Sequence, residues 1–354
     1  MWRVFVTAIL FAGAMAMAHY HPWVAGAPTP LGVTATQLLM YLSLPLLLAA
    51  IEHGLPAAGT RKSWHSWMLH LQLIISNQIL AIPIASLAFY YGTTLVKASG
   101  IGLGLIHLRL EIASIGALIS AFLLSTLISD FFFYWMHRAF HRSEILWQHH
   151  KFHHIDPAFD TLTGSRNNWI ETLFSAFAIS LPVAILFRID ENNLLEAGLF
   201  MSAIHFLFRA AIGINHSNIR MQFGWASVLW TSSQTHRIHH SRLPEHFDKN
   251  FAASTPIWDI LFGTYYHPRP DEFPPTGVEG EKEIGALWEA HIFAFREWWR
   301  MAQKARRKRC DVAALSNGEQ PLNNWMFEDS VRPSIDPGRP NPIPQPALVE
   351  LTGQ

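Results

Sequence analysis

DFFFYWMHRAFHRSEILWQHHKFHH, residues 130–154, is the stretch that decides how this chain folds and what it can bind. It contains HRAFH at residues 137–141 and HHKFHH at 149–154, and a third motif, HRIHH, follows at 236–240. The spacing is H-x-x-x-H in the first motif and H-x-x-H-H in the other two. Because residues three and four apart share one face of a helix, each motif predicts a helix with a patch of imidazoles.

The three motifs together predict a site for two metal ions. Neutral imidazole is a common ligand of iron, zinc, copper and nickel. Eight imidazoles exceed the roughly four to six ligands of one ion, and His216, at the end of a predicted hairpin, adds a ninth. A chance pattern or a metal-buffering tract is the alternative, but such tracts are padded with Gly and Ser, whereas these motifs lie among Trp, Phe and Ile. The predicted ligands are His137, His141, His150, His153, His154, His216, His236, His239 and His240.

Nearby polar residues are candidates for holding these imidazoles in place. A histidine that binds a metal usually donates from its other ring nitrogen to a carboxylate or a carbonyl. Asp130 lies two helical turns before His137 on the same face, inside an apolar segment where a carboxylate is costly. An ion pair with Arg138 or Arg166 is the alternative. Further candidates for this supporting role are His149, Glu171 and Asp259.

The composition predicts an integral, multi-pass membrane protein. Half of the residues are hydrophobic, only 15% are charged, and the mean hydropathy is +0.16, which is apolar for a soluble protein. Several apolar stretches approach the length of about 20 residues that crosses a bilayer, and residues 4–18 are either a cleaved signal or a further span. The expected fold is an all-α, polytopic helix bundle of four to six spans. The predicted spans are 35–54, 69–96, 112–136, 169–188 and 194–214.

Positive residues predict the orientation of this bundle. Arg61 and Lys62 lie between two apolar stretches and would be cytoplasmic. Counting spans onward then brings all three histidine motifs and His216 to the cytoplasmic face, so we expect a cytosolic helical cap that holds the dimetal site. The expected divisions are N-terminal membrane segments at 1–111, a catalytic domain at 112–282, an amphipathic basic helix at 283–312 and a disordered tail at 313–354.

Several classes of protein are excluded. The formal net charge is zero, so no global basic character suggests a nucleic-acid partner. The single Cys310 rules out an intrachain disulfide framework, a cysteine-ligated zinc site and an iron–sulfur cluster. The chain has neither a phosphate-binding P-loop nor an H-E-x-x-H motif.

A dimetal site at a membrane face suggests activation of O2. Oxidising an unactivated C–H bond needs a strong oxidant, and two iron ions can supply the electrons that generate it. Hydrolysis at two zinc ions is a competing chemistry, but it usually adds bridging carboxylates, which the motifs lack. A membrane metal transporter or sensor is the rival from another class, and it would place ionisable residues at mid-membrane in several spans.

At these residues the chain resembles the fatty acid hydroxylase / sterol desaturase superfamily of integral-membrane, non-haem diiron enzymes. The resemblance extends from about Asp130 to about Tyr266. It rests on Asp130-x-x-x-Tyr-Trp-x-His-Arg, Leu146-Trp-x-x-His150-x-x-His-His, Arg166-x-x-x-x-Glu171, His216-Ser-Asn, His236-Arg-x-His-His-Ser and Trp258-Asp-x-x-Phe-Gly-Thr264.

The resemblance implies two iron ions, O2 as co-substrate and a lipid substrate that is hydroxylated or desaturated. It also implies a four-helix membrane core under a cytosolic cap. Electrons would come from an external protein that is cytochrome b5-, ferredoxin- or reductase-like. Two positions depart from the family pattern: Ile212 stands where the fatty acyl hydroxylase branch tends to have a histidine, and Asn250-Phe-Ala replaces the common Asn-Tyr-Gly.

Overall fold

A computed structural model describes the central and C-terminal parts of the chain. The described residues are 45–54, 57, 62–77, 79–80, 98, 106–107, 115–175, 187–188 and 210–316. The chain divides into one unit at residues 1–303 and a second at 304–354, of which the described part is the end of one helix. The prediction of a helical fold is confirmed for the described residues, whose only sheet is a parallel pair of two-residue strands.

The elements follow the chain in a simple order. Short helical stretches lie at 45–54, 64–77, 169–175 and 210–215. The named helices and strands are β1 (Ile106–His107), α4 (Ile115–Arg142), α5 (Glu144–His154), η1 (Thr161–Ser165), β2 (Phe187–Arg188), η3 (Gly224–Val228), α8 (Ser233–His239), η4 (Pro244–His246), α9 (Ile257–Leu261) and α10 (Leu287–Ser316). Each of the three histidine motifs falls on a helix, as their spacing predicts: the first on α4, the second on α5 and the third on α8.

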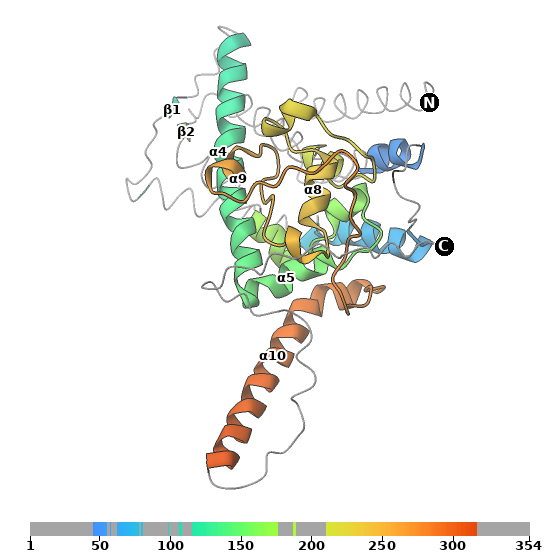
Figure 1. Cartoon of the computed structure of the whole chain (residues 1–354), viewed down its shortest axis with the longest axis vertical. Coiled ribbons are helices and arrows are strands. Elements are labelled where there is room, and N and C mark those ends of the chain that lie inside the picture. The colour runs from blue at the N-terminus through green and yellow to red at the C-terminus, as the bar shows by residue number, and fades with distance from the viewer. Residues whose placement is uncertain are drawn as a thin grey trace, which may run out of the picture. The chain divides into compact units, whose positions relative to one another are not determined.

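A sharp corner joins α4 to α5. Ser143 takes an extended backbone conformation between the two helices, and its side-chain oxygen accepts a hydrogen bond from the Leu146 amide. A serine at this position satisfies an amide that would otherwise lack a partner at the start of the helix. The chain therefore turns at Ser143, and α5 packs across the end of α4 (Figure 1). This corner brings the first two histidine motifs face to face.

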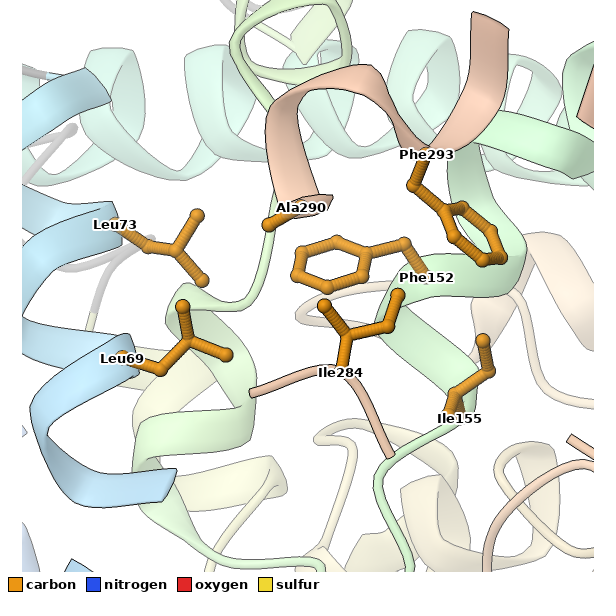
Figure 2. Close-up of a cluster of buried hydrophobic side chains, with 7 residues drawn as sticks. All are labelled: Leu69, Leu73, Phe152, Ile155, Ile284, Ala290 and Phe293. Atoms are coloured by element: carbon orange, nitrogen blue, oxygen red, sulfur yellow. The ribbon is translucent and has the colours of Figure 1, made fainter. Parts of the chain in front are cut away.

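An apolar core holds α5 from the opposite side. Leu69 and Leu73 from the helical stretch 64–77 pack with Phe152 and Ile155, and with Phe293 from α10 (Figure 2). Phe152 lies between two histidines of the second motif, on the face of α5 that points away from them. Burial of each such side chain contributes about 1.5–3 kcal/mol, so this core fixes the position of α5 and of its imidazoles.

A buried ion pair ties the start of the 64–77 helix to the same region. Lys62 Nζ lies 2.8 Å from Asp156 Oδ2, with the two side chains 1% and 0% exposed. Lys62 also donates to Asp160 and to the Thr163 hydroxyl. Asp156 and Asp160 are expected on the cytoplasmic side as well, so the burial of Lys62 does not test the predicted orientation, which stays a prediction.

Predicted spans are represented only in part. Across the stretches of chain that the structure describes, no helix is both long enough and apolar enough to cross a membrane. This finding includes α4, which contains most of the span predicted at 112–136. The predicted segments at 4–18 and, except for residues 210–214, at 194–214 lie outside the described residues. The predicted amphipathic helix appears as α10 (Leu287–Ser316), which ends four residues beyond the helix end predicted at residue 312.

Candidate metal centre

Nine histidines from across the chain converge in two groups. One group has five members, and the side-chain nitrogens within each group lie within 4.8 Å of one another. Its members are His137, His141, His150, His154 and His239, and the second group consists of His153, His216, His236 and His240. We call these the five-histidine group and the four-histidine group. Together they contain all nine residues that the sequence predicts as ligands.

Neighbouring histidines on α5 and α8 point into different groups. His153 belongs to the four-histidine group and His154 to the five-histidine group, and the same alternation separates His240 from His239. The His154 and His240 rings stack across the boundary with centroids 4.1 Å apart. The two groups are therefore in direct contact, which suits two ions close together.

Burial keeps seven of these imidazoles neutral by lowering their pKa. It lowers the pKa of His150 to about 3. Burial also lowers the pKa of His137, His153, His154, His236, His239 and His240 well below the ordinary value of 6.5. A neutral imidazole has a lone pair on one ring nitrogen, and this is the form that binds metals.

Hydrogen bonds at Nδ1 decide which nitrogen carries that lone pair. His137 Nδ1 lies 2.6 Å from the Phe251 carbonyl oxygen, and His239 Nδ1 lies 2.8 Å from that of Lys249. His216 Nδ1 lies 2.7 Å from the carbonyl oxygen of Ile212, one helical turn earlier. Because a carbonyl only accepts, each of these Nδ1 atoms carries the proton, and Nε2 is the nitrogen with the lone pair.

The separations between Nε2 atoms fit a shared metal ion. His150 Nε2 lies 2.9 Å from that of His137 and 3.1 Å from that of His154. In the other group, His216 Nε2 lies 3.1 Å from those of His153 and His236. Two nitrogens about 2.0–2.1 Å from one ion, as in zinc sites, and at right angles around it are separated by roughly 2.9–3.0 Å. Both groups therefore have the spacing of adjacent ligands.

Two Nε2 atoms also point to a missing partner. Among the described residues, the Nε2 atoms of His239 and His240 are buried without a hydrogen-bond partner. A buried polar atom without a partner costs about 1–3 kcal/mol. Since one atom lies in each group, a metal ion in each would satisfy both, and the residues present fit the predicted pair of ions.

Two of the predicted supporting residues lie beside the second motif. Glu171 Oε1 is 2.7 Å from His150 Nδ1, where the sequence analysis expected such a carboxylate. His149 lies outside both groups. Its Nδ1 faces Asn168 at 3.2 Å and its ring packs edge-on against Trp298, so His149 connects α5 to α10 and contacts none of the nine histidines through a hydrogen bond in the described structure.

Asp130 and Asp259 have other partners than expected. Asp130 was predicted to hold a histidine directly or to pair with Arg138 or Arg166, and both versions were wrong. Its carboxylate instead accepts hydrogen bonds from three backbone amides at residues 253–255. Asp259 accepts from the amides of residues 251 and 252. Both carboxylates thus bind the segment that carries the Phe251 carbonyl, because its unpaired amides need acceptors inside the fold.

Other details were not foreseen from the sequence. His246, which the sequence patterns do not single out, is buried and lies 2.9 Å from Ser241 Oγ and 3.0 Å from Glu272 Oε1. The Phe251 and Lys249 carbonyls carry no signal in a sequence, since every residue has a carbonyl. The Trp147 ring packs against His141 and His154, and its place three residues before His150 was the available clue.

Replacing Gly164 by Ala should weaken metal binding at the four-histidine group. A Cβ at Gly164 would lie 3.0 Å from Ile212 Cγ2 and 3.1 Å from His216 Nδ1, so the ring or its helix has to shift. Disturbing the groups that hold a metal ligand in place typically lowers metal affinity about 10–100-fold. We expect a loss of affinity in this range for one of two ions. Metal content after dialysis against a graded chelator measures it.

Gly285→Ala is the matched control, because a Cβ at Gly285 meets nothing within 4 Å. Equal retention of both ions in the two variants would show that the space around Gly164 does not hold His216 in place.

Comparisons with known proteins find relatives that are named as enzymes of lipids and lipid-derived compounds. The family model described as fatty acid hydroxylase matches residues 122–264. An ornithine lipid hydroxylase of Rhizobium tropici is 28% identical over 165 residues, which cover 46% of this chain and 47% of the relative. An alkylglycerol monooxygenase of Danio rerio is 30% identical over 227 residues, or 64% of this chain and 45% of the relative. A very-long-chain aldehyde decarbonylase of Oryza sativa subsp. indica is 21% identical over 170 residues, or 46% of this chain and 25% of the relative.

The matched region is only part of each relative. The match spans about half the length of the ornithine lipid hydroxylase and of the alkylglycerol monooxygenase. No solved structure matches the chain. All nine histidines of the two groups lie inside the matched residues 122–264.

Proposed function

The chain belongs to the fatty acid hydroxylase superfamily, and from this premise we propose that it oxidises an unactivated C–H bond of a membrane lipid with O2, by hydroxylation or desaturation. The proposed catalytic domain is residues 112–282. The nine histidines of the two groups hold a pair of iron ions, with five ligands for one ion and four for the other.

One observation carries this proposal: nine buried imidazoles form two touching groups whose Nε2 atoms have ligand spacing. An all-nitrogen set suits iron, zinc, copper and nickel alike. Membership of a family of lipid-oxidising enzymes favours iron over the other three. When bound, the iron pair supplies the electrons and the binding site that O2 needs to become an oxidant of C–H bonds.

The protein's own residues prepare this site. The carbonyls of Phe251 and Lys249 orient two imidazoles, and Glu171 orients a third at His150. The aromatic rings of Phe251, Phe140 and Trp147 pack around the histidines. These rings keep bulk water from the nitrogens, and a dry site strengthens each electrostatic interaction within it.

A lipid is the proposed substrate class. The relatives' names place ornithine lipids and alkylglycerols among the molecules that related enzymes oxidise, and both kinds combine a polar head with long apolar chains. Large apolar side chains on α4 and α9 are exposed in the structure, which supports a membrane location for this end of the domain. These residues are Leu123, Leu124, Phe132, Trp135, Ile257, Ile260, Leu261 and Phe262. We propose an integral membrane protein whose metal site faces the cytoplasm.

The reaction also needs an electron donor. Insertion of one atom of O2 into a C–H bond leaves the other atom to be reduced to water, and this takes an electron pair and protons from outside the substrate. We propose that a separate protein, cytochrome b5-, ferredoxin- or reductase-like, delivers the electrons.

Comparative lipid mass spectrometry tests the function. Cells that express the chain should contain a lipid class that gains oxygen or loses a hydrogen pair, and cells that express His239→Ala should lack it. The change should disappear without O2. With isotopically heavy O2, a labelled product identifies hydroxylation, and an unlabelled alkene identifies desaturation.

An unchanged lipid profile, in cells whose purified protein carries two ions per chain, would overturn the proposed oxidation. If the total metal content of those cells also changed with expression, a metal transporter or sensor would become the better reading of the histidine groups.

A further inference from the structure

One short segment contacts the five-histidine group, Asn215 next to the four-histidine group, and two buried carboxylates. It comprises residues 249–255, with the sequence KNFAAST. Five consecutive backbone amides of this segment donate to carboxylates, at distances of 2.8–3.1 Å. Asp259 accepts from Phe251 and Ala252, and Asp130 accepts from the three amides that follow. The two carboxylates thus hold the segment through its backbone amides.

The segment presents carbonyls to the metal centre. The carbonyl oxygens of Lys249 and Phe251 accept from Nδ1 of His239 and of His137, both of the five-histidine group. The next alternate carbonyl, that of Ala253, accepts from the Asn215 side chain at 2.5 Å. Asn215 immediately precedes His216 of the four-histidine group. The segment is not regularly extended, because Asn250 takes a left-handed conformation with φ of 57° and the chain bends at residues 253–254.

Each carboxylate is itself firmly placed. Asp130 lies on α4, two turns before His137, and is fully buried. Asp259 lies on α9, which ends where Gly263 takes a left-handed conformation with φ of 72°. This turn, which glycine adopts without strain, brings the Thr264 hydroxyl back to donate to Asp259 Oδ1 at 2.7 Å.

We propose that segment 249–255 is a positioning device for the metal centre, and that Asp130 and Asp259 are its positioning residues. They do not contact a metal ligand. By holding five amides they fix the carbonyls of Lys249 and Phe251, and these carbonyls keep the proton of His137 and of His239 on Nδ1, so that Nε2 of each faces the five-histidine group. The role of the segment in metal binding rests on the proposed function. The position of the segment rests on its hydrogen bonds alone.

The hydrogen bonds between these amides and the two carboxylates are strong because the acceptors are charged. Hydrogen bonds that a carboxylate accepts from amides are about twice as strong as neutral ones, and two carboxylates share five of them here. Replacing one carboxylate oxygen by an amide NH2 puts a donor against a backbone donor, so Asp→Asn both removes a hydrogen bond and adds a repulsion. The segment then loses its fixed position although the side chain keeps its size.

The test compares Asp130→Asn and Asp259→Asn with the unmodified full-length protein. Cobalt(II) titration against a competing chelator should show a drop in affinity of about 10–100-fold at one ion, the usual size of such supporting effects, with altered cobalt absorption. Because both residues act through one segment, the double variant should lose less than the sum of the two single losses. Thr264→Val removes one donor to Asp259 and also the hydrogen bond between the Thr264 and Tyr134 hydroxyls. It should give a smaller loss in the same direction, and it covers the case in which an Asp variant does not fold.

Glu52→Gln is the matched control. Glu52 is also buried and also accepts from a backbone amide and a hydroxyl, both of Thr161, but it does not touch segment 249–255. The affinity of the Glu52→Gln variant for cobalt should equal that of the unmodified protein.

A second readout needs no metal. Nitrogen NMR of labelled imidazoles in the metal-free chain should show His137 and His239 protonated on Nδ1, and a mixture of tautomers in the Asp variants. Unchanged tautomers and unchanged cobalt affinity in both Asp variants would overturn the positioning proposal. If the unmodified protein bound no ion while its tautomers still depended on Asp130, the proposed function would fail and the positioning of the imidazoles would stand.

Discussion

Single substitutions of His239 and of His240 by Ala are each expected to abolish lipid oxidation, although the two residues are adjacent. His239 belongs to the five-histidine group and His240 to the four-histidine group. Each variant should therefore lose one ion of the pair and keep the other, because only one group loses a ligand. Metal analysis of the purified protein and product formation by mass spectrometry measure the two effects separately.

His291→Gln provides the control for this experiment. The His291 imidazole lies on α10, with Nε2 3.0 Å from Ser76 Oγ, outside both groups. It should keep both ions and full activity. Near-normal turnover in either the His239 or the His240 variant would contradict a single working site built from both groups.

Asp156→Asn is expected to cause the largest loss of stability among the substitutions considered. Asp156 is fully buried, 2.8 Å from Lys62 Nζ, and the Arg166 guanidinium lies 3.9 Å from the same oxygen. Removing one partner of a buried ion pair typically lowers the free energy of unfolding by about 3–5 kcal/mol, and we expect a loss toward the lower end of this range because Lys62 keeps Asp160 as a partner. Chemical denaturation of the full-length protein measures the loss.

Asp248→Asn is the comparison at the surface. Asp248 pairs with Arg142 at 3.0 Å, but the two side chains are 25% and 55% exposed, and such pairs contribute only about 0–1 kcal/mol. Asparagine also tolerates the left-handed backbone of Asp248. A double variant that removes Lys62 as well, Lys62→Met with Asp156→Asn, should recover part of the loss. A similar small effect of Asp156→Asn and Asp248→Asn would show that the buried pair is not needed for stability.

The sequence predicts the histidine centre well, because its signals are local. Spacing of three and four residues places His137 with His141, and His150 with His154, on single faces of α4 and α5, and this follows from helix geometry alone. The count of imidazoles predicts two ions, and the structure forms two groups.

What the sequence does not reveal depends on contacts between distant residues. Asp130 shares a helix face with His137, yet it binds amides 123–125 residues later in the chain. No pattern of residue types predicts this, since backbone amides look alike at every position. The burial of Lys62 was not foreseen for the same reason: its partner Asp156 lies far away in the sequence, and only folding shows that the charge is buried.

The long reach of the two histidine groups has a consequence for the chain as a whole. Their members extend from His137 to His240, and they fasten α4, α5, the stretch 210–216 and α8 to one another. A chain with a single cysteine has no disulfide to cross-link these elements, and bound ions would act as its cross-links. Ions that bind only the folded state stabilise it by mass action. The melting temperature should therefore rise with the concentration of free metal, and a chelator should lower it.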